Sequence, residues 1–202
     1  MPFTILDADQ RTASNALAPP TLTNGALWPY NNSLYLYGGT TSRLNDSFVG
    51  YQPPTSEDTV MWRFNTESSQ WAPVELTVNG EKMPRLGGGA NVVAEDKGLA
   101  FYYGGQVDNG TSSDTANDNR ITYSNKFFVF NLGNGSVQSL PVDALATYGS
   151  SGSQMVYIPN IGKKGILVNF GGSVKPATAA DTRFRGDMVG SIPTLYIFIQ
   201  RY

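Results

Sequence analysis

The stretch Leu34-Tyr35-Leu36-Tyr37-Gly38-Gly39 decides the fold of this chain, because its pattern returns twice. An aromatic and aliphatic run ends in a glycine pair again at Leu99–Gly105 and at Gly165–Gly172. The second glycines of the three pairs are 66 and then 67 residues apart. Three copies at nearly constant spacing indicate an internal repeat, which has to be settled before any single element is interpreted.

A second landmark keeps the same period. Phe64, Phe130 and Phe198 each stand near the end of a short apolar run, and they are 66 and 68 residues apart. Trp71 follows Phe64 by seven residues, and Val137 follows Phe130 by the same interval. Two landmarks in step are much harder to obtain by chance than one, so the repeat is a structural unit.

The composition favours an all-β fold and narrows the possible partners. Of 202 residues, 40% are hydrophobic, 15% are charged and 22 are glycine, which suits short strands joined by turns. The chain has no long run with helical apolar spacing. A net charge of −2 predicts no general attraction to nucleic acid. No segment approaches the roughly 20 apolar residues of a membrane span.

The chain has neither cysteine nor histidine, which removes disulfides, thiolate metal sites and the usual general base and metal ligand. Asp108, Asp114 and Asp118 offer oxygen ligands for calcium, but their spacing does not match an EF-hand loop. Lys163-Lys164 lacks the spacing of a phosphate-binding loop and is interpreted as a hairpin turn. We therefore expect no metal, no cofactor and no enzymatic activity.

The predicted strands divide the chain into units within a single region, 1–202. Residues 3–18 are interpreted as the tail of a preceding unit, and full units span 24–78 and 87–142, with an incomplete unit at 150–202. The expected strands are 26–28, 34–37, 59–64, 70–78, 90–94, 99–103, 126–130, 137–140, 154–158, 166–170 and 194–198. The third unit lacks a fourth strand, which is typical of a fragment or a shortened gene product.

Four antiparallel strands with a glycine pair closing the second are typical of one propeller blade. The segments Leu36–Gly39, Tyr102–Gly105 and Asn169–Gly172 resemble the kelch repeat, as does the pairing of Phe64 with Trp71. The long loops resemble those of fungal kelch-like proteins, many of which are secreted or membrane-tethered. This resemblance covers about residues 20–202. It implies an all-β propeller with about three blades and, for the full-length protein, an extracellular or membrane-tethered location.

Three blades leave the ring incomplete, because propellers close with typically 4–8 blades. The flat sides of the end blades should then expose apolar surface. We expect a longer full-length chain, association with itself or a partner, or low stability alone. The N-terminal stretch 1–7 has no basic region and no apolar core, so it does not resemble a signal peptide, and the compartment is unknown from these residues.

The candidate binding surface is the face where the long loops emerge. Because strands alternate in direction, loops 40–58, 106–124 and 173–193 should share one face with the links 79–89 and 141–153. Arginine and tyrosine are favoured at binding hot spots. The candidates are Arg43, Tyr51, Arg85, Arg120, Tyr123, Arg183, Phe184 and Arg185. Alanine at Arg183 and Arg185 should weaken partner binding without altering stability.

Kelch-type propellers mostly act as non-enzymatic scaffolds, so the resemblance implies a protein or glycan partner bound on this face. One alternative is a fragment of a larger propeller without independent activity. Another is a galactose oxidase-like relative that has lost its metal site. Galactose oxidase-like enzymes bind copper through histidine and tyrosine, including a tyrosine linked to a cysteine. This chain has neither histidine nor cysteine and cannot build that site. Four asparagines fit the N-glycosylation pattern, at Asn31, Asn45, Asn109 and Asn134.

Overall fold

The computed structural model describes residues 17–41, 59–117, 120–140, 148–176 and 195–199. Within these ranges the regular elements are strands and two short 3-10 turns, η2 (Glu95–Lys97) and η3 (Ser113–Thr115). None of the helical segments described has the length and apolar character needed to cross a membrane. The predicted all-β class is confirmed for this part of the chain.

Three antiparallel sheets carry the fold. The first sheet contains, in spatial order, β1 (Leu22–Tyr30), β2 (Ser33–Thr41), β3 (Met61–Asn65) and β4 (Gln70–Val74). The second sheet contains β7 (Ala90–Ala94), β8 (Leu99–Tyr103), β11 (Phe127–Asn131) and β12 (Ser136–Leu140). The third sheet contains β14 (Gln154–Ile158), β15 (Ile166–Phe170) and β17 (Leu195–Ile199).

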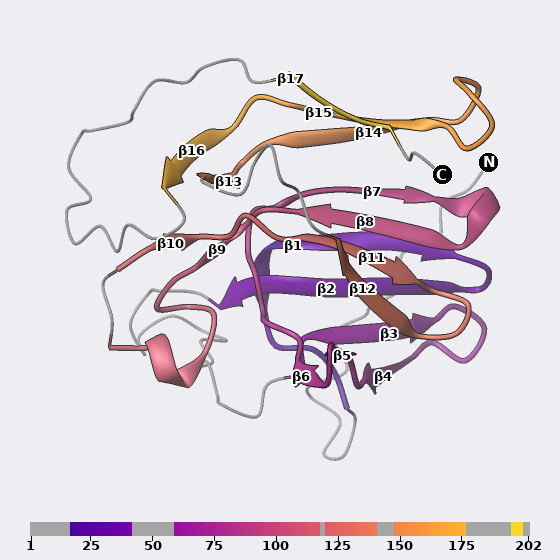
Figure 1. Ribbon diagram of the computed structural model, residues 1–202. Helices are drawn as coiled ribbons and strands as arrows, with labels where there is room; N and C mark the ends of the chain where they lie inside the picture. Colours follow the sequence, from indigo (N-terminus) through magenta and orange to yellow (C-terminus); the bar gives the residue numbers. More distant parts are fainter. Residues whose placement is uncertain (1–16, 42–58, 118–119, 141–147, 177–194, 200–202) are drawn as a thin grey trace, which may run out of the picture.

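The three sheets are stacked on one another, and β1, β7 and β14 are the equivalent edge strands of the first, second and third sheets (Figure 1). β7 contacts both β1 and β14. The hairpin turns lie together at the right of this view, and β9 (Gln106–Val107), β10 (Thr122–Tyr123), β13 (Tyr148–Ser151) and β16 (Ser173–Pro176) lie toward the left. This stacking of small antiparallel sheets fits a β-propeller-like fold.

The core between the first and second sheets is aromatic. Trp28 and Tyr37 of the first sheet meet Tyr102 and Phe130 of the second, all of them fully buried. The Phe130 ring centroid is 4.9 Å from those of both Trp28 and Tyr37, and Tyr37 meets Tyr102 edge-on at 4.9 Å. Tilted and edge-on arrangements at these separations are favourable beyond simple area burial.

A smaller core joins the second and third sheets. Tyr103 and Phe127 of the second sheet pack with Met155 and Leu167 of the third. Neighbouring residues of a strand point to opposite faces, so Tyr102 and Tyr103 belong to different interfaces. The second sheet is therefore apolar on both faces.

The glycine pairs are sites of left-handed backbone, as their residue type predicts. The φ angles of Gly38, Gly104 and Gly171 are 68°, 74° and 72°, and those of the following glycines are 83–87°. A Cβ on Gly38 would lie 2.1 Å from the Leu86 carbonyl oxygen, and one on Gly104 would lie 2.3 Å from the Ser150 oxygen. The first glycine of a pair thus allows the next sheet to approach, which is a packing requirement as well as a conformational one.

The two landmarks that follow each other by seven residues in the sequence face each other across the outer strands. Phe64 pairs with Trp71 across β3 and β4, and their ring centroids are 5.0 Å apart. Phe130 pairs with Val137 at the equivalent position of the second sheet. Valine thus occupies the position that tryptophan holds in the first copy.

Two strand predictions are wrong in their extent. The fourth strand does not run from 70 to 78, because β4 ends at Val74 and Thr77–Val78 (β5) turns back onto Glu81–Lys82 (β6). Pro73 near the end of β4 lacks an N–H to extend the ladder. The second strand of the first sheet also runs past its glycine pair, because Thr40 and Thr41 continue β2 and pair with Thr23 and Leu22. In the other two sheets, β8 and β15 end directly before their glycine pairs. The tail predicted at 3–18 lies almost entirely outside the described residues.

Candidate functional site: the long-loop face

The described parts of the predicted binding loops come together at one end of the sheets. We call this surface the long-loop face and define it as residues 40–41, 106–117, 120–124, 148–152 and 173–176. It holds β9, η3, β10, β13 and β16, at the left of Figure 1. The remainder of loops 40–58 and 173–193 lies outside the described residues.

In the second and third copies the long loop begins in backbone pairing with the segment that precedes its own sheet. β16 pairs with β13 through four residue pairs, from Tyr148↔Pro176 to Ser151↔Ser173. In the second copy Gln106 pairs with Gly87 by an isolated bridge, and Gln106 and Val107 pair with β10. The loops are therefore held by backbone hydrogen bonds at their bases, and do not start as free coil.

The loop 106–124 connects neighbouring repeats. The Thr41 N–H donates to the Gly110 carbonyl over 2.9 Å, and the Thr41 hydroxyl donates to the same oxygen over 3.2 Å. At its other end the Ser150 N–H donates to the Ser124 carbonyl over 3.1 Å. One loop of the second repeat is thus fixed to both the first and the third.

A buried carboxylate organises the first half of this loop. Asp108 is 1% exposed, and its Oδ1 accepts from the Gly110 N–H over 2.8 Å while Oδ2 accepts from Gln106 Nε2 over 2.8 Å. Its carbonyl oxygen accepts from the hydroxyls of Thr111 and Thr115, each over 2.6 Å. A buried carboxylate satisfied in this way rigidifies the surrounding backbone. Asp108 therefore acts as a structural centre of the loop.

The second half of the loop packs directly against β13. A Cβ added to Gly149 would lie 2.4 Å from the Tyr123 carbonyl oxygen, so only glycine permits this approach of the two backbones. Burial raises the pKa of the half-buried Tyr123 phenol above its usual value. Tyr123 thus contributes a partly covered aromatic ring to the long-loop face.

The predicted binding residues have different surroundings. Arg120 is exposed beside β10, and Tyr123 is half-buried next to it. Arg85 is buried, 6% exposed, and its Nη2 donates to the Thr59 carbonyl over 3.1 Å, so this side chain braces the link before the second sheet. The other predicted residues lie outside the described part of the chain: Arg43, Tyr51, Arg183, Phe184 and Arg185.

The glycosylation candidates lie at two ends of the sheets. Asn31 in the β1–β2 turn and Asn134 in the β11–β12 turn are exposed at the tight-turn end. Asn109 lies on the long-loop face, where it is half-buried and its Oδ1 is buried without a hydrogen-bond partner among the described residues. Asn45 lies outside the described residues.

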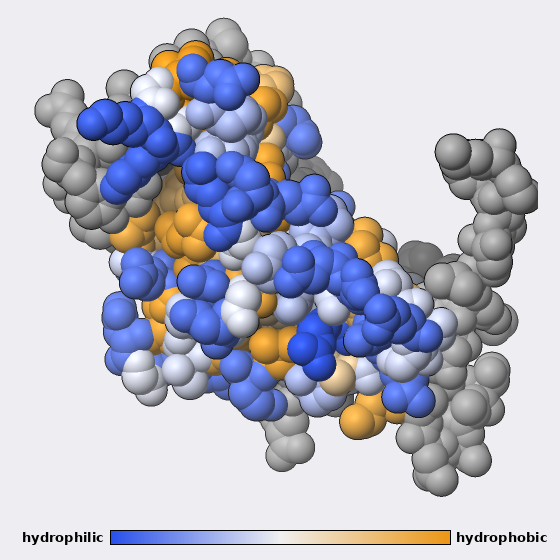
Figure 2. All heavy atoms as spheres, turned by 90° about the vertical axis from the view of Figure 1, so that its right-hand side faces the viewer, coloured by the Kyte–Doolittle hydropathy of each residue, from blue (hydrophilic) through white to orange (hydrophobic). Residues whose placement is uncertain are grey.

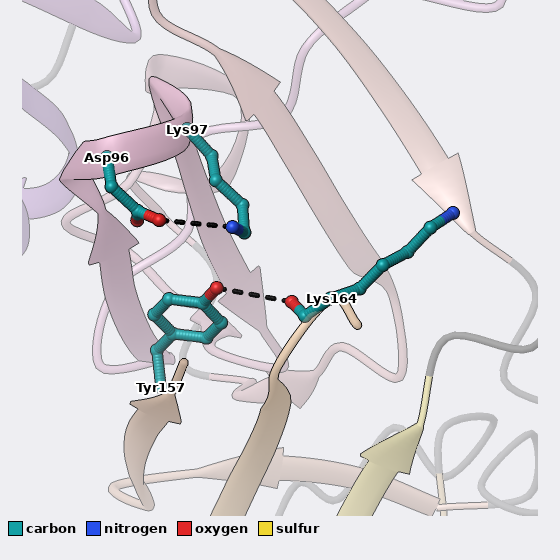
Figure 3. A network of polar contacts seen from close by, with 4 residues as sticks. All are labelled: Asp96, Lys97, Tyr157 and Lys164. Carbon is teal, nitrogen blue, oxygen red and sulfur yellow. Dashed lines mark hydrogen bonds and ion pairs between the residues drawn. The ribbon is translucent and has the colours of Figure 1, made fainter. Parts of the chain in front are cut away.

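The opposite end carries hairpin turns and is mostly hydrophilic, with apolar residues visible in narrow areas (Figure 2). A polar network there connects the second and third sheets (Figure 3). The Lys97 ammonium is 3.0 Å from the Asp96 carboxylate and 5.8 Å from the centre of the Tyr157 ring, and the Tyr157 hydroxyl donates to the Lys164 carbonyl over 3.1 Å. These groups are solvated, so the network contributes little stability.

Sequence reasoning missed one polar residue in the core. Asn169 is 0% exposed, and neither of its amide atoms has a hydrogen-bond partner among the described residues. It stands two residues before the first glycine of its pair, where the second copy has Tyr102, whose hydroxyl accepts from the Gly89 N–H over 2.9 Å. Asparagine in an otherwise apolar run was the available signal.

The acidic groups of the described part of the long-loop face do not form a cluster. Within the described ranges, no group of three His, Cys, Asp or Glu side chains is placed to hold a metal ion. The Asp108 carboxylate is engaged by the loop itself, and Asp114 in η3 is exposed. The face presents the described parts of loop 106–124, which are hydrogen-bonded to Thr41 and Ser150, with Asp114, Arg120 and Tyr123 beside them.

Comparison with known proteins gives one informative relative, and no family model matches the chain. The chain is 25% identical to a kelch repeat-containing protein of Arthroderma benhamiae over an alignment of 191 residues. The alignment covers 76% of this chain and 27% of the relative, so the chain spans about a quarter of that protein's length. The repeated glycine pairs, the stacked antiparallel sheets and this distant relative together fit a kelch-type repeat scaffold.

Proposed function

We propose that this chain is a non-enzymatic kelch-type scaffold that binds a protein partner through the long-loop face. The observation that carries the proposal is that loop 106–124 of the second repeat is hydrogen-bonded to both neighbouring repeats. It accepts a backbone hydrogen bond from Thr41 of the first repeat and another from Ser150 of the third. A loop already ordered before binding loses less conformational entropy when the partner arrives, which favours affinity. Binding residues are commonly placed on loops held by a rigid scaffold.

Several further observations support a protein partner. The relative is named for its kelch repeats, and repeats of this kind are commonly used for protein interaction. Arg120 and Tyr123 are residue types favoured at protein interfaces. The absence of histidine and cysteine from the sequence favours a scaffold over a galactose oxidase-like enzyme. The proposal also includes the remaining parts of loops 40–58 and 173–193 in the binding face.

The test uses charge reversal at the two ends of the sheets. The chain is screened against a displayed peptide library and a glycan array, and the selected ligands are measured with Arg120→Glu and with Lys163→Glu. Lys163 is the matched control because it is exposed in the β14–β15 turn at the opposite end. We expect Arg120→Glu to weaken peptide binding at least about tenfold, or about 1.4 kcal/mol, and Lys163→Glu to leave it unchanged.

Equal effects of the two variants would place binding elsewhere and contradict the proposal. Selection of glycans alone would replace the protein partner by a carbohydrate. A second arm uses Arg183→Ala and Arg185→Ala, which the sequence predicts to weaken the same binding while the melting temperature stays constant.

A further inference from the structure

The dipeptide Asn-Gly occurs four times in the sequence, and it has a chemical reactivity of its own. The backbone nitrogen of the glycine can attack the side-chain carbonyl carbon of the asparagine, because a residue without a Cβ leaves this nitrogen accessible. The four dipeptides are Asn24-Gly25, Asn79-Gly80, Asn109-Gly110 and Asn134-Gly135. All four lie in described parts of the chain, and their surroundings differ.

The first and third dipeptides are fixed by contacts between the sheets. The Asn24 carbonyl accepts from the Gly88 N–H over 2.8 Å, which holds the peptide unit that contains the attacking nitrogen. In the third dipeptide the Gly110 N–H donates to Asp108 Oδ1 over 2.8 Å, and the Gly110 carbonyl accepts from the Thr41 N–H. Attack at either place requires local opening of the fold.

The fourth dipeptide is exposed, but both of its reacting groups are engaged. The Gly135 N–H donates to the Asn131 carbonyl over 2.8 Å. The Asn134 Oδ1 accepts from the Ser136 N–H over 3.0 Å. The nitrogen and the side-chain amide must each lose a hydrogen bond before they can meet.

The second dipeptide has none of these restraints. Asn79 and Gly80 form the two-residue turn between β5 and β6, with φ of 53° and 82°, as in a type I′ turn. Both are exposed, and no described residue is hydrogen-bonded to the Asn79 side chain or the Gly80 N–H. No described atom lies within 4 Å of the Cβ position of Gly80. The β5–β6 ladder has only the pairs Thr77↔Lys82 and Val78↔Glu81, and so short a hairpin opens easily.

We propose that Asn79 is a site of spontaneous deamidation, which proceeds there faster than at the other three dipeptides of the folded chain. The Gly80 nitrogen forms a bond to the Asn79 Cγ and loses its proton, and the side-chain nitrogen leaves as ammonia. The product is a five-membered succinimide. Water then adds to either carbonyl of this ring and opens it, which gives aspartate or isoaspartate. The reaction consumes only water, without an oxidant or a reductant.

The modification changes a link between the first and second sheets. Isoaspartate carries the backbone through the former side-chain carbon, so the loop becomes longer, and hairpin register depends on loop length. Val78 pairs with Glu81 in this hairpin and packs against the aromatic core between the two sheets. Deamidation therefore places a negative charge near the exposed Glu81 and loosens the packing of Val78, while the three sheets stay formed.

The test follows the conversion of each asparagine by peptide mass spectrometry while the folded 202-residue chain is stored at mildly alkaline pH. We expect Asn79 to convert at least about tenfold faster than any of the other three, because those must first open locally. The control is the same chain unfolded in urea, where the four identical dipeptides should convert at similar rates. Comparable rates at all four sites of the folded chain would overturn the proposal. So would an Asn79 that stays intact when folded but converts when unfolded.

A variant tests whether hydrogen bonding causes the difference. Asp108→Ala removes the acceptor of the Gly110 N–H, so conversion of Asn109 should rise at least about tenfold. Asn134 is the matched internal control, because its turn does not contact Asp108, and its rate should stay unchanged. An Asn109 that reacts no faster in this variant would overturn the proposal as well, because hydrogen bonds would then not protect the other dipeptides.

Discussion

Replacing Gly104 by alanine tests how closely the second and third sheets are interlocked. The φ of Gly104 is 74°, a left-handed conformation that costs a residue with a Cβ about 1–2 kcal/mol. The added Cβ would also lie 2.3 Å from the Ser150 carbonyl oxygen. The two sheets must then move apart, which weakens the hydrogen bond from the Gly105 N–H to the Ser150 carbonyl. Leaving these buried groups without a partner costs about 1–3 kcal/mol of folding free energy.

Gly171→Ala is the matched comparison, because its φ of 72° gives the same conformational cost without a described neighbour at the Cβ position. We expect a loss of about 2–5 kcal/mol for Gly104→Ala and about 1–2 kcal/mol for Gly171→Ala. For a chain of this length, each kcal/mol lowers the melting temperature by about 2–4 °C. Gly104→Ala should therefore melt roughly 4–20 °C below the unmodified chain.

The assay is thermal unfolding followed by circular dichroism, at a concentration low enough that the chain is monomeric. Gly104 and Gly171 occupy the same position in successive repeats. Their surroundings differ in that a Cβ on Gly104 would meet Ser150, whereas no described atom lies near the Cβ position of Gly171. Equal melting temperatures for Gly104→Ala and Gly171→Ala would refute the reasoning, because the close approach of the sheets would then contribute nothing.

Three further predictions concern the core and the long-loop face. Burial raises the pKa of the Tyr102 phenol, so the unfolded state loses this proton at a lower pH than the folded state does. The free energy of unfolding should therefore fall as the pH rises above about 10, by up to about 1.4 kcal/mol per pH unit until the folded pKa is reached. Urea unfolding at pH 8 and pH 11 measures this fall, and Tyr102→Phe should reduce it. Trp28→Phe should cost about 1–3 kcal/mol, because it leaves a cavity and removes the 3.1 Å hydrogen bond to Asn91, and chemical unfolding measures the loss. Asp108→Ala should accelerate hydrogen exchange at the Gly110 amide at least tenfold, while amides of β7 keep their protection.

Much of the sheet arrangement follows from the sequence, because its signals are local and periodic. The runs before Gly104 and Gly171 predict β8 and β15 with the observed bounds. The pairing of Phe64 with Trp71 follows from their seven-residue spacing about a tight turn. These features depend on side-chain alternation and turn length, which single strands already reveal.

The pairings at the long-loop face could not be predicted in the same way. β13 and β16 join segments more than twenty residues apart, and neither carries a strong alternating pattern. Asp108 appears in the sequence as one acid in a polar loop, yet it is buried because backbone and threonine groups fold around it. The residue type and the link that carries it predict Arg85 at the binding face, whereas its side chain is buried and donates to the Thr59 carbonyl.

The most direct test of the stacked-sheet account is the set of nuclear Overhauser contacts between aromatic rings of the first and second sheets. Trp28 and Phe130 are more than a hundred residues apart in sequence, and their ring centroids are 4.9 Å apart. Tyr37 and Tyr102 meet at the same separation. The account predicts contacts between the members of both pairs. It would be contradicted if the Trp28 and Tyr37 rings showed contacts only to residues of their own sheet.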